Sequence, residues 1–287
     1  MVTNTDKLKL LYIMGAGRSG STIFGILLGN MPCNFYAGEL HMWNLHSGNA
    51  NNDRIEVKAF WERVKLEMPV VENYYGNKYY KYLEYHNSFL FCPWLTKKKL
   101  ISEYHEFNRQ LISSIKKVAN KEYVIDSSHY PFRALWLSKN KNIDTHFIYL
   151  YRHPFNVVES FSKKNIEHKS KNPVSANIYL FFVTLLSLIV YFILPKGQKT
   201  KIRYEDVVTS PELVINKFNK LLNAQNTVID FSRLNIGYVF QSNRIRHFET
   251  IALKPKESTN KLNLFWKFFT VICQFPFLLI NKRTKNI

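Results

Sequence analysis

A glycine-rich segment near the start of the chain limits the possible fold more than any other feature. Residues 15–22 read GAGRSGST and lie between an apolar run that favours a strand and a segment with apolar residues at helical spacing. A strand, a glycine loop and a helix in this order bring backbone N–H groups to the helix N-terminus, where they can bind phosphate oxygens. A tight turn with no ligand would explain the glycines, but not an arginine together with three hydroxyl side chains. The candidate anion-binding residues are Gly17, Arg18, Ser19, Gly20, Ser21 and Thr22.

The strand-to-helix pattern recurs three more times along the chain. Residues 122–137, 144–161 and 200–222 each begin with a β-rich run, continue through polar residues and end in a helix that starts at or near a proline. Strands alternating with helices predict a parallel sheet covered on both faces, so we expect an α/β fold of the P-loop type. Ligands of such sheets bind beyond the carboxyl ends of the strands, where the polar clusters of this chain fall.

The length of 287 residues fits one large domain. Within residues 1–287 we expect a phosphate loop and catalytic segment at 8–48 and a mostly helical insertion on the acceptor side at 49–120. The rest of the nucleotide-binding core follows at 121–250, and a basic and apolar tail at 251–287.

The loop lacks the lysine of an ordinary ATP-binding P-loop. Ser21 occupies the lysine position, and the cation stands three residues earlier, at Arg18. The usual contact of lysine with the β- and γ-phosphates is therefore missing. This change argues against an ordinary kinase or ATPase.

At this point the residues resemble the sulfotransferases that use 3′-phosphoadenosine 5′-phosphosulfate (PAPS), above all their bacterial and protein-tyrosine branches. GAGRSGST is similar to the family loop for the 5′-phosphosulfate, and YRHPFNVVESF supplies, as Arg152 and Ser160, the pair that binds the 3′-phosphate. IRYEDVVTSPE is similar to a family segment whose tyrosine, here Tyr204, lines the nucleotide, and QSNRIR resembles a later loop that acts through Asn243 and Arg246. The resemblance runs from about residue 10 to about residue 247 outside the insertion, and it implies PAPS as co-substrate with no metal.

The resemblance also implies the catalytic groups. Glu39 in YAGELHMW matches the position of the family's catalytic carboxylate, and it would act as the base for the acceptor hydroxyl. A glutamate that caps a helix is the structural alternative. Arg18 would stabilise charge on the sulfonate or the bridging oxygen.

The chain departs from the family at two positions. VIDSSHYPFRAL resembles a segment in which lysine follows Asp-Ser-Ser, but His129 stands there, and Ser242 replaces the glycine of the late loop. An imidazole with a pKa of about 6.5 carries little charge at pH 7, so we expect activity to fall as the pH rises through about 7. His129→Lys would remove that fall, whereas a purely structural His129 would leave a flat profile.

Charge and cysteine content restrict the partners and the compartment. The chain has 40 Lys and Arg against 21 Asp and Glu, a net charge of +19, which favours anionic partners. Cys33, Cys92 and Cys273 lack the spacings of metal or disulfide frameworks. Without a recognisable signal peptide, we expect a cytoplasmic protein that can also lie peripherally at the inner face of a membrane.

Two apolar segments bear on that membrane contact. Residues 178–194 have no charge, and they can form either a helix buried on the sheet or a helix that faces a membrane. A second apolar stretch at 264–280 includes Lys267 and is followed by a basic terminus.

The acceptor is not specified by any motif. A saccharide, a lipid-linked molecule or a small molecule with a hydroxyl group would each suit the reaction. Six tyrosines of the insertion could form a stacking platform or a half-buried helix face: Tyr74, Tyr75, Tyr79, Tyr80, Tyr82 and Tyr85. The alternative functions are a kinase for a nucleoside or sugar and a basic membrane-associated protein with a degenerate nucleotide site, while no motif for nucleic-acid binding is present.

Overall fold

The computed structural model describes residues 7–50, 52–68, 83–85, 98–163, 170–225, 228–241, 244–254 and 262–282. Among the predicted site residues, Asn243 lies outside these ranges, and so does the side chain of Arg246. Ser242, Cys92 and all the tyrosines of the expected platform except Tyr85 also lie outside them.

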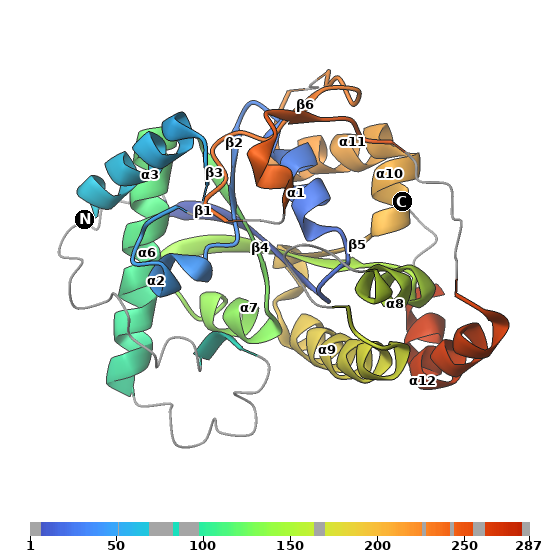
Figure 1. The fold of residues 1–287 in the computed structure, drawn as a ribbon. Coiled ribbons are helices and arrows are strands. Elements are labelled where there is room, and N and C mark those ends of the chain that lie inside the picture. Colours follow the sequence, from blue (N-terminus) through green and yellow to red (C-terminus); the bar gives the residue numbers. More distant parts are fainter. Residues whose placement is uncertain are drawn as a thin grey trace.

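A five-stranded parallel sheet forms the centre of the molecule (Figure 1). Its strands are β1 (Leu8–Gly15), β2 (Asn34–Gly38), β3 (Tyr123–His129), β4 (Ile143–Tyr151) and β5 (Lys199–Arg203), in the spatial order β2-β3-β1-β4-β5. Each neighbouring pair is parallel, so the five carboxyl ends lie at the same edge. The predicted α/β fold with a parallel sheet is confirmed. β1 lies between β3 and β4, and the loop after β1 therefore starts where the strand order reverses.

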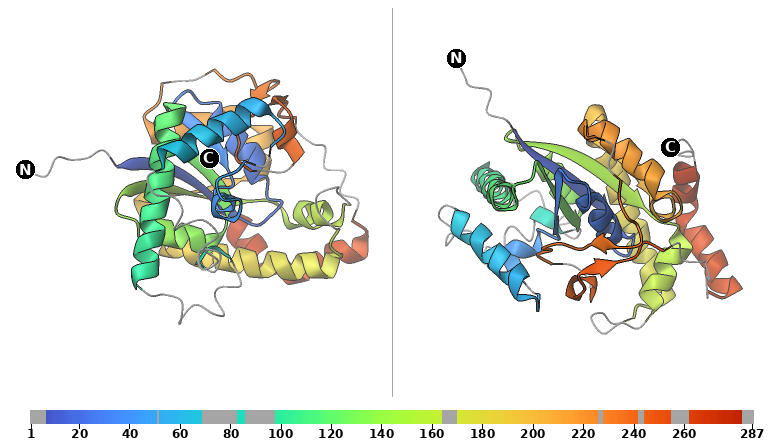
Figure 2. Two further views of the ribbon diagram at one scale, coloured as in Figure 1. Left: turned by 60° about the vertical axis from the view of Figure 1, so that its left-hand side comes forward. Right: turned by 90° about the horizontal axis from the view of Figure 1, so that it is seen from above.

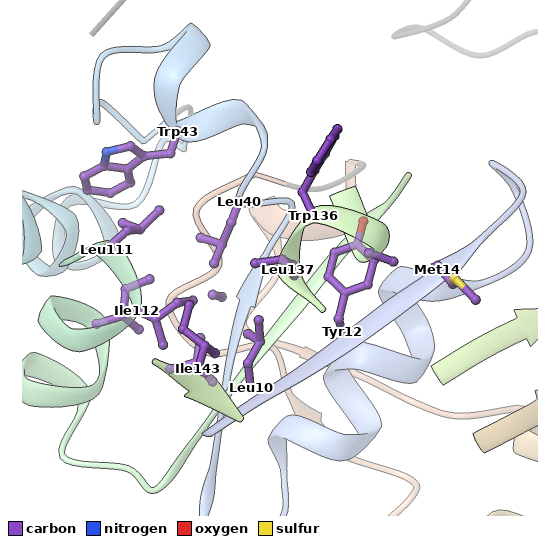
Figure 3. Close-up of a cluster of buried hydrophobic side chains, with 14 of the residues drawn as sticks. Leu10, Tyr12, Met14, Leu40, Trp43, Leu111, Ile112, Trp136, Leu137 and Ile143 are labelled. Carbon is purple, nitrogen blue, oxygen red and sulfur yellow. The ribbon is translucent and has the colours of Figure 1, made fainter. Parts of the chain in front are cut away.

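Alternate side chains of β1 enter two hydrophobic cores, one on each face of the sheet. Leu10, Tyr12 and Met14 belong to the first core (Figure 3), which is covered by α3 (Ile55–Glu67), α6 (Lys98–Ala119), α7 (Pro131–Leu137) and one side of α9 (Pro173–Ile193). Leu11 and Ile13 belong to the second, under α1 (Ser21–Gly29), α10 (Tyr204–Thr209) and α11 (Pro211–Leu222). Helices thus cover both faces, as continuously apolar strands require.

The remaining described elements lie between or after these strands and helices along the chain. They are α2 (Met42–Leu45), α8 (Pro154–Ser162), α12 (Leu264–Lys282), the 3-10 turns Lys196–Gln198 and Arg244–His247, and the short strands β6 (Leu234–Asn235) and β7 (Thr250–Ile251). Proline begins α7, α8, α9 and α11, where its missing N–H costs no helical hydrogen bond. These prolines explain why each helix starts so soon after the preceding strand or loop.

Helix α9 contains the apolar segment 178–194 and is neither fully buried nor fully exposed. Leu188 and Val190 belong to the first core, whereas Ile178, Phe182 and Ile189 are exposed. Its neighbour is α12, and the two helices lie side by side in Figures 1 and 2.

Candidate functional site

Five predicted positions follow the carboxyl ends of the five strands. The glycine loop follows β1, Glu39 follows β2, His129 ends β3, Arg152 follows β4 and Tyr204 follows β5. The register places Met14 beside His129 and Gly15 beside Leu150, so the ends of β3 and β4 flank the loop. The parallel topology therefore gathers positions that are far apart in the sequence.

The loop turns tightly into α1. The N–H of Ser19 donates to the carbonyl of Ala16 at 3.2 Å, and the N–H of Phe24 donates to the carbonyl of Gly20 at 3.0 Å. Gly20 precedes the helix with a φ of +96° and caps it with no side chain. The first N–H groups of α1 thus have no cap from the residue before the helix, which leaves them suited to an anion.

Gly20 is needed for a second reason, its contact with Tyr204. A Cβ atom at Gly20 would lie 2.1 Å from the ring of Tyr204, closer than any side chain allows. The guanidinium carbon of Arg152 lies 4.7 Å from the centroid of the same ring, within reach of a cation–π contact. Nη1 of Arg152 also donates to the carbonyl of Arg18 at 3.1 Å. The residues predicted to bind the nucleotide at the ends of β1, β4 and β5 are therefore packed together.

Two polar atoms of this group are buried without a hydrogen-bond partner among the described residues, the hydroxyl of Ser19 and Nε of Arg152. Ser19 is only 1% exposed. Because buried polar atoms are nearly always hydrogen-bonded in folded proteins, both atoms are consistent with a bound polar ligand. A donor set of hydroxyl, guanidinium and helix N–H groups suits phosphate or sulfonate oxygens.

Ser160 lies on α8, in the second turn after the helix begins at Pro154. It is half-buried, and no hydrogen bond joins it to Arg152. The pairing of Ser160 with Arg152 in binding a 3′-phosphate stays a prediction.

Tyr179 of α9 is a loop neighbour that sequence reasoning missed. The N–H of Gly17 donates to its hydroxyl at 3.0 Å. Burial raises the pKa of that hydroxyl, the Arg18 guanidinium lowers it and the Glu39 carboxylate raises it. Arg18 and Glu39 therefore both lie within electrostatic reach of one hydroxyl at the loop. No motif marks Tyr179, since it sits inside an apolar run.

Glu39 is held by the late part of the chain. Its N–H donates to the carbonyl of Gln241 at 2.9 Å, and the N–H of Phe240 donates to the carbonyl of Ala37 at 2.9 Å. Gly38 has a φ of +85°, and a Cβ atom there would lie 2.5 Å from the Gln241 carbonyl oxygen. The segment that resembles the family's late loop thus extends the sheet edge beside Glu39.

A buried polar network joins the ends of β2 and β3. Oδ1 of Asp126 accepts from the N–H of Ser128 at 2.9 Å and from the N–H of Leu40 at 3.3 Å. The hydroxyl of Ser128 accepts from the N–H of His41 at 3.0 Å. Leu40 and His41 directly follow Glu39, so this network positions the candidate base.

The same aspartate is anchored on its other side by an arginine. Nε of Arg133 donates to Oδ2 of Asp126 at 2.9 Å, and its Nη1 pairs with Glu84. All three side chains are almost completely buried. Asp126 and Arg133 both lie in the segment VIDSSHYPFRAL, seven residues apart. No motif in that segment predicts their contact.

His129 stands at the end of β3 with a φ of +56°. Its ring lies 4.5 Å from the ring of Tyr130 and 6.0 Å from that of His41, measured between centroids. Burial lowers the pKa of His129 to about 4. The imidazole is therefore neutral at pH 7, and the titration expected near pH 7 from the sequence moves to about pH 4.

Two candidate site residues, Arg18 after β1 and His129 at the end of β3, have a left-handed backbone conformation. Arg18 has a φ of +66°, which costs a residue with a Cβ atom of the order of 1–2 kcal/mol, and His129 shares the conformation. Such strain persists where the surrounding structure holds it, often at functional positions. Among the described residues, no group of three or more His, Cys, Asp and Glu side chains could hold a metal ion.

A cavity of about 740 Å³ lies beside α12, and its lining includes Tyr151 and His153, the chain neighbours of Arg152. Its lining includes Phe275 and Leu279 of α12 together with Arg203, and it includes none of the predicted site residues. The phosphate loop instead borders a small cavity of about 20 Å³ that is lined by Ala16, Ser19 and Arg152. Two buried hydrogen-bond donors without a partner among the described residues, the Ser19 hydroxyl and Nε of Arg152, lie at the phosphate loop, which makes the loop the better candidate for the ligand site.

The fold has relatives among solved structures. The sulfotransferase domain from the curacin biosynthetic pathway is 19% identical, with a TM-score of 0.54 over 93% of this chain and 96% of that domain. The sulfotransferase domain from the Synechococcus PCC 7002 olefin synthase is 16% identical, with a TM-score of 0.56 over 94% of each chain. No protein-family model matches the sequence, and no curated protein is significantly similar to it. The chain thus has a bacterial sulfotransferase-like fold.

Proposed function

We propose that this protein transfers a sulfonate group from PAPS to a hydroxyl group of an acceptor. The observation that carries the proposal is the gathering of Arg18, Arg152 and the buried Ser19 hydroxyl around a glycine loop that has no P-loop lysine. The sulfotransferase-like fold supports the same reading.

The residues at the ends of β1, β4 and β5 would hold the donor. The N-terminus of α1 and the Ser19 hydroxyl suit the 5′-phosphosulfate, and the Arg152 guanidinium suits the 3′-phosphate. The ring of Tyr204, packed on Gly20, offers a flat surface to the nucleotide. PAPS, when bound, supplies an activated sulfonate.

The ends of β2 and β3 serve the acceptor. Glu39 takes the proton of the attacking hydroxyl, the new S–O bond forms, and the bond to the nucleotide breaks to leave 3′,5′-ADP. Arg18 stabilises the negative charge that develops at the transferred group. Neutral His129 adds no charge beside the transferred group.

The wall next to Glu39 and His129 is aromatic. The Tyr85 and Tyr130 rings lie 4.7 Å apart between centroids, and His41 lies 4.8 Å from Tyr130. The Glu39 carboxylate acts electrostatically on both tyrosines. Such a wall suits an acceptor with a ring or an apolar body beside its hydroxyl, such as a saccharide, a lipid-linked molecule or an aromatic small molecule.

Thermal stability with 3′,5′-ADP, ATP and AMP at equal concentrations tests the donor. A ligand at about 100 times its dissociation constant stabilises the fold by about 2.7 kcal/mol, a shift that is easily measured. We expect stabilisation by 3′,5′-ADP that disappears in Arg152→Ala. Stabilisation by ATP alone would favour a kinase, and no stabilisation by any of the three would favour a degenerate site.

A further inference from the structure

Helices α9 and α12 carry apolar side chains on the outside of the molecule. Among the described residues, two helices are long and apolar enough to cross a membrane by length and composition, Pro173–Ile193 and Leu264–Asn281. An apolar window of 18 residues in each is 44% and 17% buried, respectively. The exposed apolar residues follow helical spacing, so they form one stripe on each helix. We call these stripes the α9–α12 apolar surface: Val174, Ile178, Phe182, Leu185, Ile189, Phe192 and Ile193 on α9, and Leu264, Phe265, Phe268, Ile272, Phe275 and Leu279 on α12.

Polar groups lie between the two helices instead. Nδ2 of Asn177 donates to the Thr270 hydroxyl at 3.1 Å, and Nε2 of Gln274 donates to the Asn177 carbonyl at 3.0 Å. All three residues are completely buried. This arrangement, polar inside and apolar outside, is the reverse of a water-facing helix pair and is typical of helices in contact with lipid.

The segments that contain these helices are basic, and acidic residues begin beyond their ends, at Glu167, Glu205 and Glu257. Residues 168–204 contain six Lys and Arg, and residues 258–287 contain five, with no Asp or Glu in either stretch. Lys199 caps the last carbonyls of α9, and Lys201 reaches the carbonyl of Ile280 in α12. This charge is complementary to an anionic lipid surface, whereas it would repel the same face of a second copy of the chain.

Helix α9 cannot leave the fold to span a bilayer. Leu188 and Val190 pack in the first core, and the Tyr179 hydroxyl accepts from the N–H of Gly17. The helix also runs almost directly into β5, after a single 3-10 turn. A membrane can therefore meet only its outer side.

From these contacts we propose that the α9–α12 apolar surface docks the protein on an anionic membrane, with both helices lying in the plane of the interface. The apolar stripes enter the boundary between headgroups and acyl chains, and exposed lysines such as Lys196 contact acidic headgroups. The cavity beside α12, which shares Phe275 and Leu279 with this surface, offers room for a lipid chain. The proposal is independent of the chemistry at the phosphate loop.

Flotation with lipid vesicles tests the docking. We expect the wild-type protein to float with vesicles of phosphatidylcholine containing about 30% phosphatidylserine, and less at high salt. The double variant Phe182→Glu/Phe268→Glu should reduce the floated fraction about tenfold or more, since it places charge in both stripes. Both positions are more than half exposed, so circular dichroism should match that of the wild type.

The matched control is Ile55→Glu/Leu66→Glu. It makes the same change of charge at exposed apolar positions of α3, on a different part of the surface (Figure 1). The control should float like the wild type. Equal flotation of both double variants, or no flotation of the wild type, would overturn the proposal.

Three further measurements distinguish docking on the membrane surface from a dimer contact and from a membrane-spanning helix. Light scattering should show that the protein is a monomer in solution. The surface would instead be assigned to a second copy if the protein formed a dimer that Phe182→Glu/Phe268→Glu dissociates, and if it did not float with vesicles.

Alkaline extraction should release the bound protein from the vesicles. Resistance to extraction would instead indicate a helix that spans the membrane. Brominated lipids should quench the tryptophan fluorescence of Phe268→Trp more than that of the wild type, because Phe268 is an exposed residue of the α9–α12 apolar surface, and equal quenching would contradict the docking.

Discussion

The two halves of the candidate site are built in different ways. The half that would hold the donor, at the ends of β1, β4 and β5, consists of a glycine loop, Arg152 and Tyr204 in close contact. The half that would serve the acceptor, at the ends of β2 and β3, depends on a buried network that holds the backbone after Glu39. The donor half is thus encoded in short contiguous motifs, and the acceptor half in contacts between distant segments. Changes in each half should therefore separate binding from turnover.

The largest expected effect is the loss of turnover in Glu39→Gln, which should leave nucleotide binding in the donor half unchanged. Loss of a general base should lower turnover by about 10²- to 10⁴-fold, while the affinity for 3′,5′-ADP stays near that of the wild type. Transfer of radiolabelled sulfonate and nucleotide titration measure the two quantities. The control Glu103→Gln, on the surface of α6, should behave like the wild type. Retained turnover in Glu39→Gln would show that Glu39 is not the base. If the affinity for 3′,5′-ADP fell together with turnover, the two halves of the site would not act separately.

Arg133→Met should break the support of the acceptor half. It leaves Asp126 and Glu84 buried without their cation, and losing one partner of a buried pair costs about 3–5 kcal/mol in the free energy of unfolding. Burial raises the pKa of Glu84 even beside Arg133, so without the arginine the variant should lose stability as the pH rises. Urea unfolding at about pH 6 and about pH 8 measures this. A loss under about 1 kcal/mol at both pH values would show that the network contributes little.

Arg152→Ala should affect the donor half alone. Removing a charged hydrogen-bond donor costs about 1.5–3 kcal/mol, which corresponds to a roughly 10- to 150-fold weaker affinity for 3′,5′-ADP. Turnover at saturating donor should change much less. The control is Arg109→Ala, whose side chain pairs with Glu106 on α6. Equal losses in both variants would mean that overall positive charge, not the Arg152 contact, attracts the nucleotide.

The smallest effect concerns the pH profile of His129. Because burial lowers the pKa of its imidazole to about 4, turnover should be flat between about pH 6 and about pH 8. The folded protein keeps the His129 ring neutral, whereas the unfolded chain protonates it below its ordinary pKa of about 6.5. The stability that His129 contributes is therefore present above about pH 6.5 and is lost as the pH falls toward 4. His129→Lys should raise turnover a few-fold at a pH where the new ammonium group is charged, since burial also lowers the pKa of a lysine at this position. A wild-type fall in turnover through about pH 7 would instead indicate that the bound donor restores an ordinary pKa.

The sequence predicted those parts of the site that depend on local order. The glycine loop, Glu39, Arg152 and Tyr204 each follow a strand, and parallel topology gathers strand ends without further information. Sequence reasoning missed Tyr179, which meets Gly17 across 162 residues, and the contact of Leu40 with Asp126 across 86 residues. No periodicity or motif specifies such pairs, because they depend on how helices and loops pack over the sheet.

By itself, the sequence determined the parallel α/β sheet and the position of the candidate site residues after its strands, since hydrophobic periodicity, proline-started helices and a glycine loop act over short distances. Only the tertiary structure decided how the groups behave. Burial, which lowers the pKa of His129, and the two-sided packing of α9 are properties of surroundings that come from remote segments. Whether an apolar helix faces a core or a membrane, and whether an imidazole is charged, depends on what lies against it in space.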